Sequence, residues 1–195
     1  MNTPEITTSR LRLRRFTPED LPAFMEIMGD ETANEFLPWF PPKTPDEAKV
    51  FLGKSFLDTY ERPQGFRYAI CLKNDGIPIG YVNLSSGESN DFGYGLRSEF
   101  WHRGIVSEAC MAVVEEIRKA GVPFITATHD VNNPRSGNVM KKLGMKYCYS
   151  YREQWQPKNI PVVFRMYQLN FDGDDGRVYQ KYREMYPCNF IEENV

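Results

Sequence analysis

Two places where a strand runs through a short loop into a helix constrain this chain more than any other feature. The first lies at residues 100–109, between a predicted strand at 91–96 and a strongly periodic helix at 107–120. The second lies at 132–136, after a short apolar strand at 124–128. The first turn of a helix has backbone N–H groups without intrahelical acceptors, and the helix dipole adds positive potential there. Each junction therefore predicts an anion site, and the pair predicts a site for a long phosphorylated cofactor.

The rest of the chain has the pattern of an α+β domain. Alternating or continuous apolar runs predict further strands at residues 11–14, 66–72, 77–84, 146–156 and 161–170. Helical spacing of apolar residues, with a proline near each start, predicts helices that begin after Thr17, after Thr44 and at Pro134. We therefore expect a mixed, mostly antiparallel twisted sheet of about seven strands flanked by about four helices, with a short extra helix near the C-terminus.

Two details of this pattern carry local predictions. The strand–helix–strand unit at 91–128 is expected to be a right-handed parallel crossover. Gly93 and Gly95 lie inside the strand at 91–96 and indicate either a bulge or a close approach of a ligand to the backbone.

Composition narrows the classes of function. A net charge of −2 argues against a dominant surface for nucleic acid or membrane. The four cysteines form no CxxC pair and there are only two histidines, so we expect no metal site. Residues 1–10 lack an apolar signal region, and no apolar run approaches the roughly 20 residues of a membrane helix. We therefore expect a cytoplasmic protein.

Four groups of residues resemble the GNAT superfamily of N-acetyltransferases, and its RimJ/RimL branch most closely. They are residues 10–14, Glu19 with Asp20, Gly93-Tyr94 ahead of 101–109, and Asn133 and Ser136 followed by 142–145. The resemblance covers about residues 8–170. It implies a GNAT domain at 1–170 and a C-terminal extension at 171–195 that packs on the same domain or on a dimer partner.

The resemblance implies an enzyme that moves the acetyl group of acetyl-coenzyme A directly to a primary amine in a ternary complex. The acceptor is expected to be a small amine or the N-terminus of a peptide or protein. The near-zero net charge argues mildly against a ribosome-bound enzyme. A homodimer is compatible with the resemblance. The alternative, from another class, is a catalytically weak module of the same fold that binds acyl-coenzyme A as a sensor or partner.

The resemblance also assigns cofactor-binding residues. Backbone N–H groups of 103–107 are expected to bind the pyrophosphate, and residues 96–97 to offer backbone hydrogen bonds to the pantetheine arm. Val106 stands where the family has a small residue, a departure that puts the cofactor affinity in question. Asn133 is expected to cap its helix, to contact the pantetheine, or both. The complete expected set is Leu96, Arg97, His102, Arg103, Gly104, Ile105, Val106, Ser107, Asn133 and Ser136.

Catalysis needs a neutral amine nucleophile and a proton for the leaving thiolate, so the site is expected to contain a base and an acid. Ser136 matches the family position that reaches the thioester sulfur, although a serine in a first helical turn is also satisfied locally. Glu153 is the candidate base, near where RimL-like enzymes place a glutamate, with Glu35 and Glu99 as rivals. The residues expected to line the acceptor pocket, with core or dimer packing as the alternative, are Trp39, Phe40, Tyr94 and Trp155.

Overall fold

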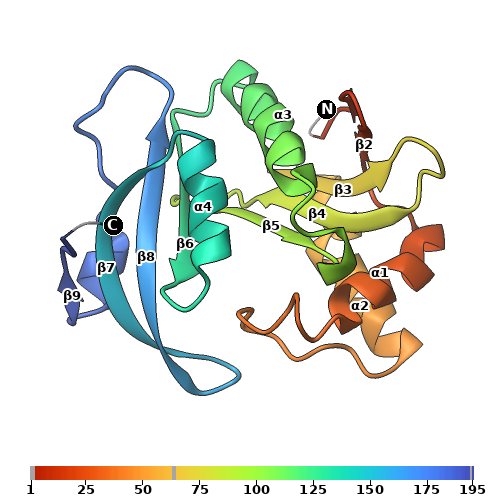
Figure 1. Ribbon diagram of the computed structural model, residues 1–195, viewed down its shortest axis with the longest axis horizontal. Helices are drawn as coiled ribbons and strands as arrows, with labels where there is room; N and C mark the ends of the chain where they lie inside the picture. Colours follow the sequence, from red (N-terminus) through yellow and green to blue (C-terminus); the bar gives the residue numbers. More distant parts are fainter. Residues whose placement is uncertain (1–2, 63–64, 194) are drawn as a thin grey trace.

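The computed structural model describes residues 3–62, 65–193 and 195 as two antiparallel sheets with helices packed on them (Figure 1). The first sheet has the strand order β1-β2-β3-β4-β5 and the second the order β6-β8-β7-β9. The strands are β1 (Ile6–Thr7), β2 (Leu11–Arg14), β3 (Phe66–Leu72), β4 (Pro78–Leu84), β5 (Phe92–Leu96), β6 (Phe124–Asp130), β7 (Lys146–Trp155), β8 (Ile160–Asn170) and β9 (Asn189–Phe190). All seven expected strands are present, and β1 and β9 are short additions. The predicted α+β class is confirmed.

The two sheets meet at a single parallel bridge between Asp91 and Thr126. The parallel relation expected of this strand–helix–strand unit is thus confirmed, although it extends over only one residue pair. Beyond the bridge β5 and β6 diverge, and α4 lies in front of the divergence (Figure 1). One predicted sheet has therefore become two, joined at one end.

Five helices cover the sheets in the described part of the chain: α1 (Leu21–Gly29), α2 (Pro45–Ser55), α3 (Ile105–Lys119), α4 (Pro134–Lys142) and α5 (Lys181–Met185). Alternation along β3 and β4 divides the core. Tyr68 and Val82 face the main core with α3 and α4, whereas Ala69 and Tyr81 face α1 and α2 on the other side. No helix in the part of the chain described here has both the length and the apolar composition needed to cross a membrane.

Local signals account for most element boundaries. Thr44 accepts a hydrogen bond from the Glu47 N–H (3.2 Å) and caps α2, as its position before Pro45 predicts. The helix predicted at 107–120 begins two residues earlier, because Gly104 rather than a polar side chain takes the N-cap position. The C-terminal helix is restricted to α5.

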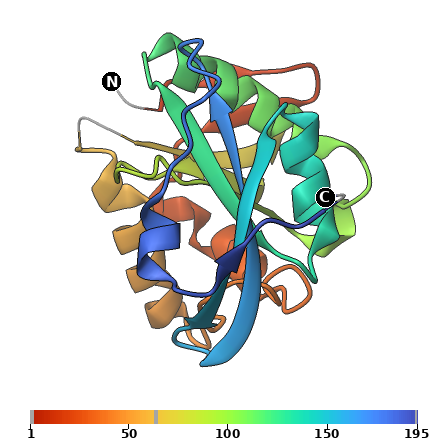
Figure 2. The same cartoon turned by 90° about the vertical axis from the view of Figure 1, so that its left-hand side faces the viewer.

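The C-terminal extension wraps around the edge of the second sheet (Figure 2). β9 pairs with β7 at Ser150–Phe190. The Tyr149 hydroxyl donates to the Tyr179 carbonyl (2.6 Å), and Arg165 forms an ion pair with Glu192 (2.5 Å). These contacts hold the extension against the second sheet of the same chain.

Candidate active site

A cavity of about 640 Å³ lies where the two sheets diverge. One end, here called the helix end, is formed by residues of the 100–107 loop and of α4. The other, here called the aromatic end, is formed by the 32–39 loop and by side chains of both sheets: Tyr81, Asn83, Asp91, Thr128, Asp130, Trp155 and Phe164. A single cavity thus joins the two segments that the sequence pattern singled out, the helix N-termini and the proline-rich aromatic loop.

The loop at the helix end turns through two residues in the left-handed region, His102 (φ 60°) and Gly104 (φ 72°). The first intrahelical bond of α3 runs from the Glu108 N–H to the Gly104 carbonyl (3.1 Å). The N–H groups of residues 105–107 therefore have no intrahelical acceptor. His102, Gly104 and residues 105–107 line the cavity, whereas Arg103 stacks over the Phe100 ring (5.6 Å).

A cluster of hydrogen bonds holds this loop from below. The Glu108 carboxylate accepts from Thr8 Oγ1 (2.6 Å), Ser9 Oγ (3.0 Å) and Arg10 Nε (2.6 Å). Burial alone would raise the pKa of Glu108, but these hydrogen bonds outweigh it and lower the pKa to about 2. Arg10 Nη1 also donates to the Arg103 carbonyl (2.9 Å). Arg10, noted in the sequence only as part of a motif, thus fixes the loop.

The β5 backbone offers hydrogen-bonding groups to the cavity at every second residue. The Arg97 N–H donates to the Ile79 carbonyl (3.0 Å), so Gly80 and Leu96 form a non-hydrogen-bonded pair of the ladder. The backbone groups of Leu96 are therefore directed away from β4, toward the divergence of the sheets. The Leu96 carbonyl accepts from Trp101 Nε1 (2.8 Å), which leaves its N–H facing the cavity.

The expectation for Arg97 is wrong in this geometry. Its N–H is already bonded within the sheet, and its side chain pairs with Glu26 and Glu99 outside the cavity. The residue lies one step beyond Leu96 along β5, so its backbone faces β4 instead of the open edge.

Gly93 and Gly95 do not mark a bulge, because the β4–β5 register is regular throughout. A Cβ on Gly95 would lie 2.5 Å from Tyr81 Cε1, and one on Gly93 would lie 2.5 Å from Asn83 Oδ1. The close approach that these glycines permit is therefore made by two β4 side chains, which lie across β5 and reach the cavity.

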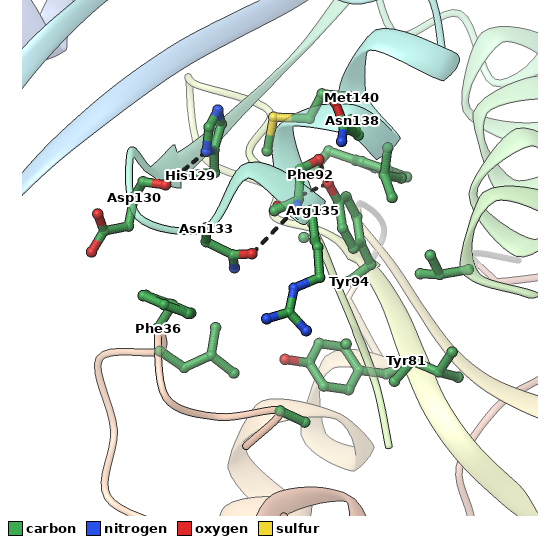
Figure 3. Close-up of a pocket in the computed structure, with 18 of the residues that line it drawn as sticks. Phe36, Tyr81, Phe92, Tyr94, His129, Asp130, Asn133, Arg135, Asn138 and Met140 are labelled. Carbon is green, nitrogen blue, oxygen red and sulfur yellow. Dashed lines mark hydrogen bonds between the residues drawn. The ribbon is translucent and has the colours of Figure 1, made fainter. Parts of the chain in front are cut away.

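At the start of α4, Asn133 Oδ1 accepts from the Ser136 N–H (3.4 Å), which confirms Asn133 as the helix cap. The Tyr94 hydroxyl donates to the Ser136 carbonyl (2.8 Å) and lies 3.0 Å from Ser136 Oγ. Burial raises the pKa of Tyr94, so this hydroxyl stays protonated at neutral pH. Tyr94, expected in the acceptor pocket, lines the cavity (Figure 3), but its hydroxyl bonds to Ser136.

Two further residues near α4 were missed by the sequence reasoning. Arg135 reaches from α4 into the cavity (Figure 3), and its guanidinium lies over the Trp101 ring (4.6 Å). His129 lies beneath α4 with Nδ1 2.8 Å from the Asp130 carbonyl, and burial lowers its pKa. Its Nε2 is buried without a hydrogen-bond partner in the described part of the chain. Both residues lie close in sequence to the 132–136 junction, and this proximity could have indicated that they lie near the cofactor site.

Of the four aromatic side chains expected in the acceptor pocket, two lie at the aromatic end. Trp39 and Trp155 line the cavity, and Trp39 also packs on Phe51 (5.5 Å), so its role in acceptor binding stays a prediction beside its packing role. The prediction for Phe40 is wrong, because its side chain is 61% exposed and lies outside the cavity lining. Phe36, from the same loop, takes its place.

None of the glutamates considered as bases lines the cavity. Glu153 lies on β7, where burial raises its pKa and a hydrogen bond with Tyr186 of the extension partly opposes that rise. The carboxylate that does line the cavity next to β5 is Asp91, whose pKa burial raises to about 6. The sequence pattern marked Asp91 only as the first residue of a strand.

The comparisons agree with this geometry. A model of the acetyltransferase (GNAT) domain matches residues 10–146. The uncharacterized N-acetyltransferase YnaD of Bacillus subtilis is 30% identical over 162 residues, which are 80% of this chain and 88% of YnaD. The structure of RimL, a ribosomal L7/L12 alpha-N-protein acetyltransferase in complex with coenzyme A, superposes with a TM-score of 0.76 at 19% identity, covering 88% of this chain and 100% of RimL.

A third similar structure is the microcin C7 self-immunity acetyltransferase MccE in complex with acetyl-coenzyme A and AMP. It has a TM-score of 0.72 at 16% identity and covers 84% of this chain and 93% of its own. At such identities the structural likeness shows the fold, whereas the domain match spans most of the chain. The protein therefore belongs to the GNAT family of acetyltransferases, N-acetyltransferases that use acetyl-coenzyme A, as its two strand-to-helix junctions and flanking motifs predicted.

Proposed function

We propose that this protein transfers the acetyl group of acetyl-coenzyme A directly to a primary amine held at the other end of the same cavity. The observation that carries the proposal is the continuity of that cavity, which runs from the first turn of α3 to the aromatic end. Cofactor and acceptor can therefore be bound together, as a ternary complex requires. The presence of coenzyme A in the RimL structure and of acetyl-coenzyme A in the MccE structure supports the choice of cofactor.

In this proposal the pyrophosphate binds to the N–H groups of residues 105–107, with charge from His102, Arg103 and Arg135. The Leu96 N–H and Asn133 serve the pantetheine arm. Val106 packs partly against the main core, so part of its added volume lies away from the phosphates. Gly104 has no side chain to cover the backbone at the N-cap. The nearest atom to a Cβ built on it would be Arg10 Nη2 at 3.6 Å, so the space next to this backbone is open.

The chemistry requires the amine nitrogen to attack the thioester carbonyl carbon and the carbon–sulfur bond to break. Ser136 is proposed to donate the proton that the leaving sulfur takes up. Its Oγ is held by Tyr94 at the first turn of α4, where the helix dipole also stabilises developing negative charge. The acceptor is a small amine or a peptide N-terminus. The second class matches RimL, which is an alpha-N-protein acetyltransferase of ribosomal L7/L12.

Release of free thiol from acetyl-coenzyme A tests the function directly. We expect the protein to bind acetyl-coenzyme A in a calorimetric titration and to release thiol only when an amine is present. Binding without thiol release across a broad amine panel would favour the sensor or partner module instead. An absence of heat at millimolar acetyl-coenzyme A would contradict the cofactor assignment itself.

A further inference from the structure

We propose that Asp91 binds the ammonium group of a compact, apolar primary amine at the aromatic end and accepts its proton before the acetyl transfer. This inference rests on the proposed function and names the substrate class and proton acceptor of the same site. It is carried by the direction in which Asp91 faces, by the charges along the cavity and by the way in which the aromatic end is closed.

Asp91 faces the acceptor side of the first sheet. Along β5, Phe92 and Leu96 are buried in the main core beneath α3 and α4. Side chains alternate along a strand, so Asp91 lies on the opposite face, with the two glycines of β5. That face carries Tyr81 and Asn83, which lie across the glycines and line the cavity with Asp91.

The surroundings of Asp91 leave its carboxylate free to bind a ligand. Its backbone is fixed, because the Asp91 N–H donates to Ser85 Oγ (3.2 Å) and its carbonyl accepts from the Ser85 N–H (2.9 Å). Within the described residues, no group donates a hydrogen bond to the carboxylate. The titratable groups that interact electrostatically with it are Arg67 on β3, Tyr151 on β7, and Tyr179 and Tyr182 of the extension.

Arg67 does not neutralise Asp91 by direct contact. Its guanidinium donates to the Leu84 carbonyl (2.7 Å) and the Ser55 carbonyl (3.1 Å) instead. Burial therefore dominates and raises the pKa of Asp91 to about 6, with Arg67 acting against it. At neutral pH such a group is ionised enough to attract an ammonium and basic enough to accept a proton.

Basic and acidic side chains come from different parts of the cavity lining, as binding of an ammonium group requires. The basic side chains of the lining that come from the 100–107 loop and α4 are His102, Arg135 and Lys142. The rest of the described lining has no lysine or arginine and carries the carboxylates of Asp91 and Asp130 among aromatic rings, and Arg135 is the one of these cations whose side chain Figure 3 shows directed toward Tyr81. An acceptor with its own carboxylate would meet repulsion there, whereas an ammonium on an apolar or aromatic body fits both features.

A lysine also links the two segments on either side of the aromatic end, the 32–39 loop and the β7–β8 turn. Lys158, in the turn between β7 and β8, donates to the carbonyls of Asn34 (3.2 Å) and Glu35 (3.0 Å) in the loop that carries Phe36 and Trp39. Figure 1 shows this loop reaching toward the β7–β8 turn. Because the bridge joins the walls beside the cavity, a compact amine fits better than an extended peptide chain.

The proton balance follows from these positions. An alkylammonium, with a pKa of about 10 in water, gives one proton to Asp91 and becomes the neutral nucleophile. Its nitrogen bonds to the thioester carbon, the carbon–sulfur bond breaks, and the thiolate takes a proton from Ser136. The nitrogen, now bonded to carbon, loses a second proton to the Ser136 oxygen and so regenerates the hydroxyl. Asp91 releases its proton to solvent. The products are the amide and the free thiol.

Matched acceptors and variants test this assignment. We expect 2-phenylethylamine to be acetylated with a kcat/KM at least about tenfold above that of phenylalanine, which differs by one carboxylate, and above that of phenylalanyl-alanine amide, which continues the chain. Asp91→Asn should lower kcat/KM for 2-phenylethylamine at least about tenfold with an unchanged Kd for acetyl-coenzyme A. Asp58→Asn, which removes an exposed carboxylate outside the cavity, is the control.

The pH profile supplies a readout that a purely structural role would not change. In the parent enzyme kcat/KM should rise through about pH 6, at the same pH for amines of different basicity, and Asp91→Asn should lack this limb. If the rising limb instead moves with the acceptor's own pKa, the assignment is overturned even if the variant is unstable. Loss of activity in Glu153→Gln with an active Asp91→Asn would transfer the role to Glu153.

Different results would contradict the acetyltransferase function and the substrate class. If no amine in the panel releases thiol, the proposed function fails. If amines are acetylated but phenylalanine or the dipeptide amide outperforms 2-phenylethylamine, only the substrate class assigned here is wrong.

Discussion

The hydroxyl of Tyr94 lies 2.8 Å from the backbone carbonyl of Ser136 and 3.0 Å from its Oγ. Tyr94 is on β5 of the first sheet, whereas Ser136 is in the first turn of α4, which packs on β6 of the second sheet. This contact therefore joins the two halves of the molecule across the cavity, away from the Asp91–Thr126 bridge. It also fixes the hydroxyl that we propose as the proton donor to the leaving sulfur.

Removing this contact should affect turnover more than cofactor binding. Tyr94→Phe keeps the ring but loses its hydrogen bonds, at a cost of about 1 kcal/mol in stability. Ser136→Ala removes the donor itself. We expect both to lower kcat with little change in the Kd for acetyl-coenzyme A, and the double variant to be scarcely slower than Ser136→Ala. Additive losses in steady-state kinetics would show that the two hydroxyls act independently.

Gly104 should be required for cofactor binding because of its backbone conformation. At φ 72° a β-branched residue is strained whatever the surrounding space, so Gly104→Val should change the turn that presents the first N–H groups of α3. We expect the affinity for acetyl-coenzyme A to fall at least about tenfold in a calorimetric titration.

A matched control exists at the other end of the same helix. Gly121 has φ 76° and also has room for a Cβ. Gly121→Val should lower the melting temperature by a similar amount but leave acetyl-coenzyme A binding intact. Normal binding by Gly104→Val would show that the phosphates bind elsewhere.

The parts of this site that the sequence predicted are those set by local chemistry. Asn133 before a proline predicts a helix cap, and a glycine ahead of a periodic helix predicts an open first turn, because each effect acts within a few residues. The core strands were predictable for the same reason, since alternation records which face is buried.

The parts that were missed depend on contacts between distant segments. Glu153 has the right residue type on the right strand, but the extension supplies Tyr186 as its partner, and nothing in the local sequence indicates that contact. Asp91 lines the cavity because β5 and β6 part after one bridge. Phe40 and Phe36 are equivalent by composition, and only the path of their loop decides which one faces the cavity.

Trp39 should affect both stability and acceptor binding, since it packs on Phe51 and lines the aromatic end. Trp39→Ala should raise the acceptor KM several-fold and leave the KM for acetyl-coenzyme A nearly unchanged, with a stability loss of up to about 3–5 kcal/mol. Phe51→Ala removes the packing partner, which lies outside the cavity lining, and should chiefly lower stability. Equal steady-state constants for Trp39→Ala and the parent at low temperature would remove Trp39 from the acceptor site.

The Glu108 cluster predicts a pH dependence of stability. The pKa of Glu108 is about 2 in the folded protein, below its ordinary value of 4.5, so folding favours the ionised form. Its contribution is complete above pH 4.5 and is lost as the pH falls toward about 2. Glu108→Gln should therefore be less stable than the parent at pH 7 in urea unfolding, and the difference should shrink below pH 4.5.

The Glu108→Gln variant should also bind acetyl-coenzyme A more weakly, because Arg10 loses the partner that holds it against the Arg103 carbonyl. Glu116→Gln, on the same helix but paired only with Lys119 among the residues described, should change neither property appreciably. A stability difference that stays constant from pH 7 to pH 3 would show that packing, and not the charge of Glu108, holds the loop.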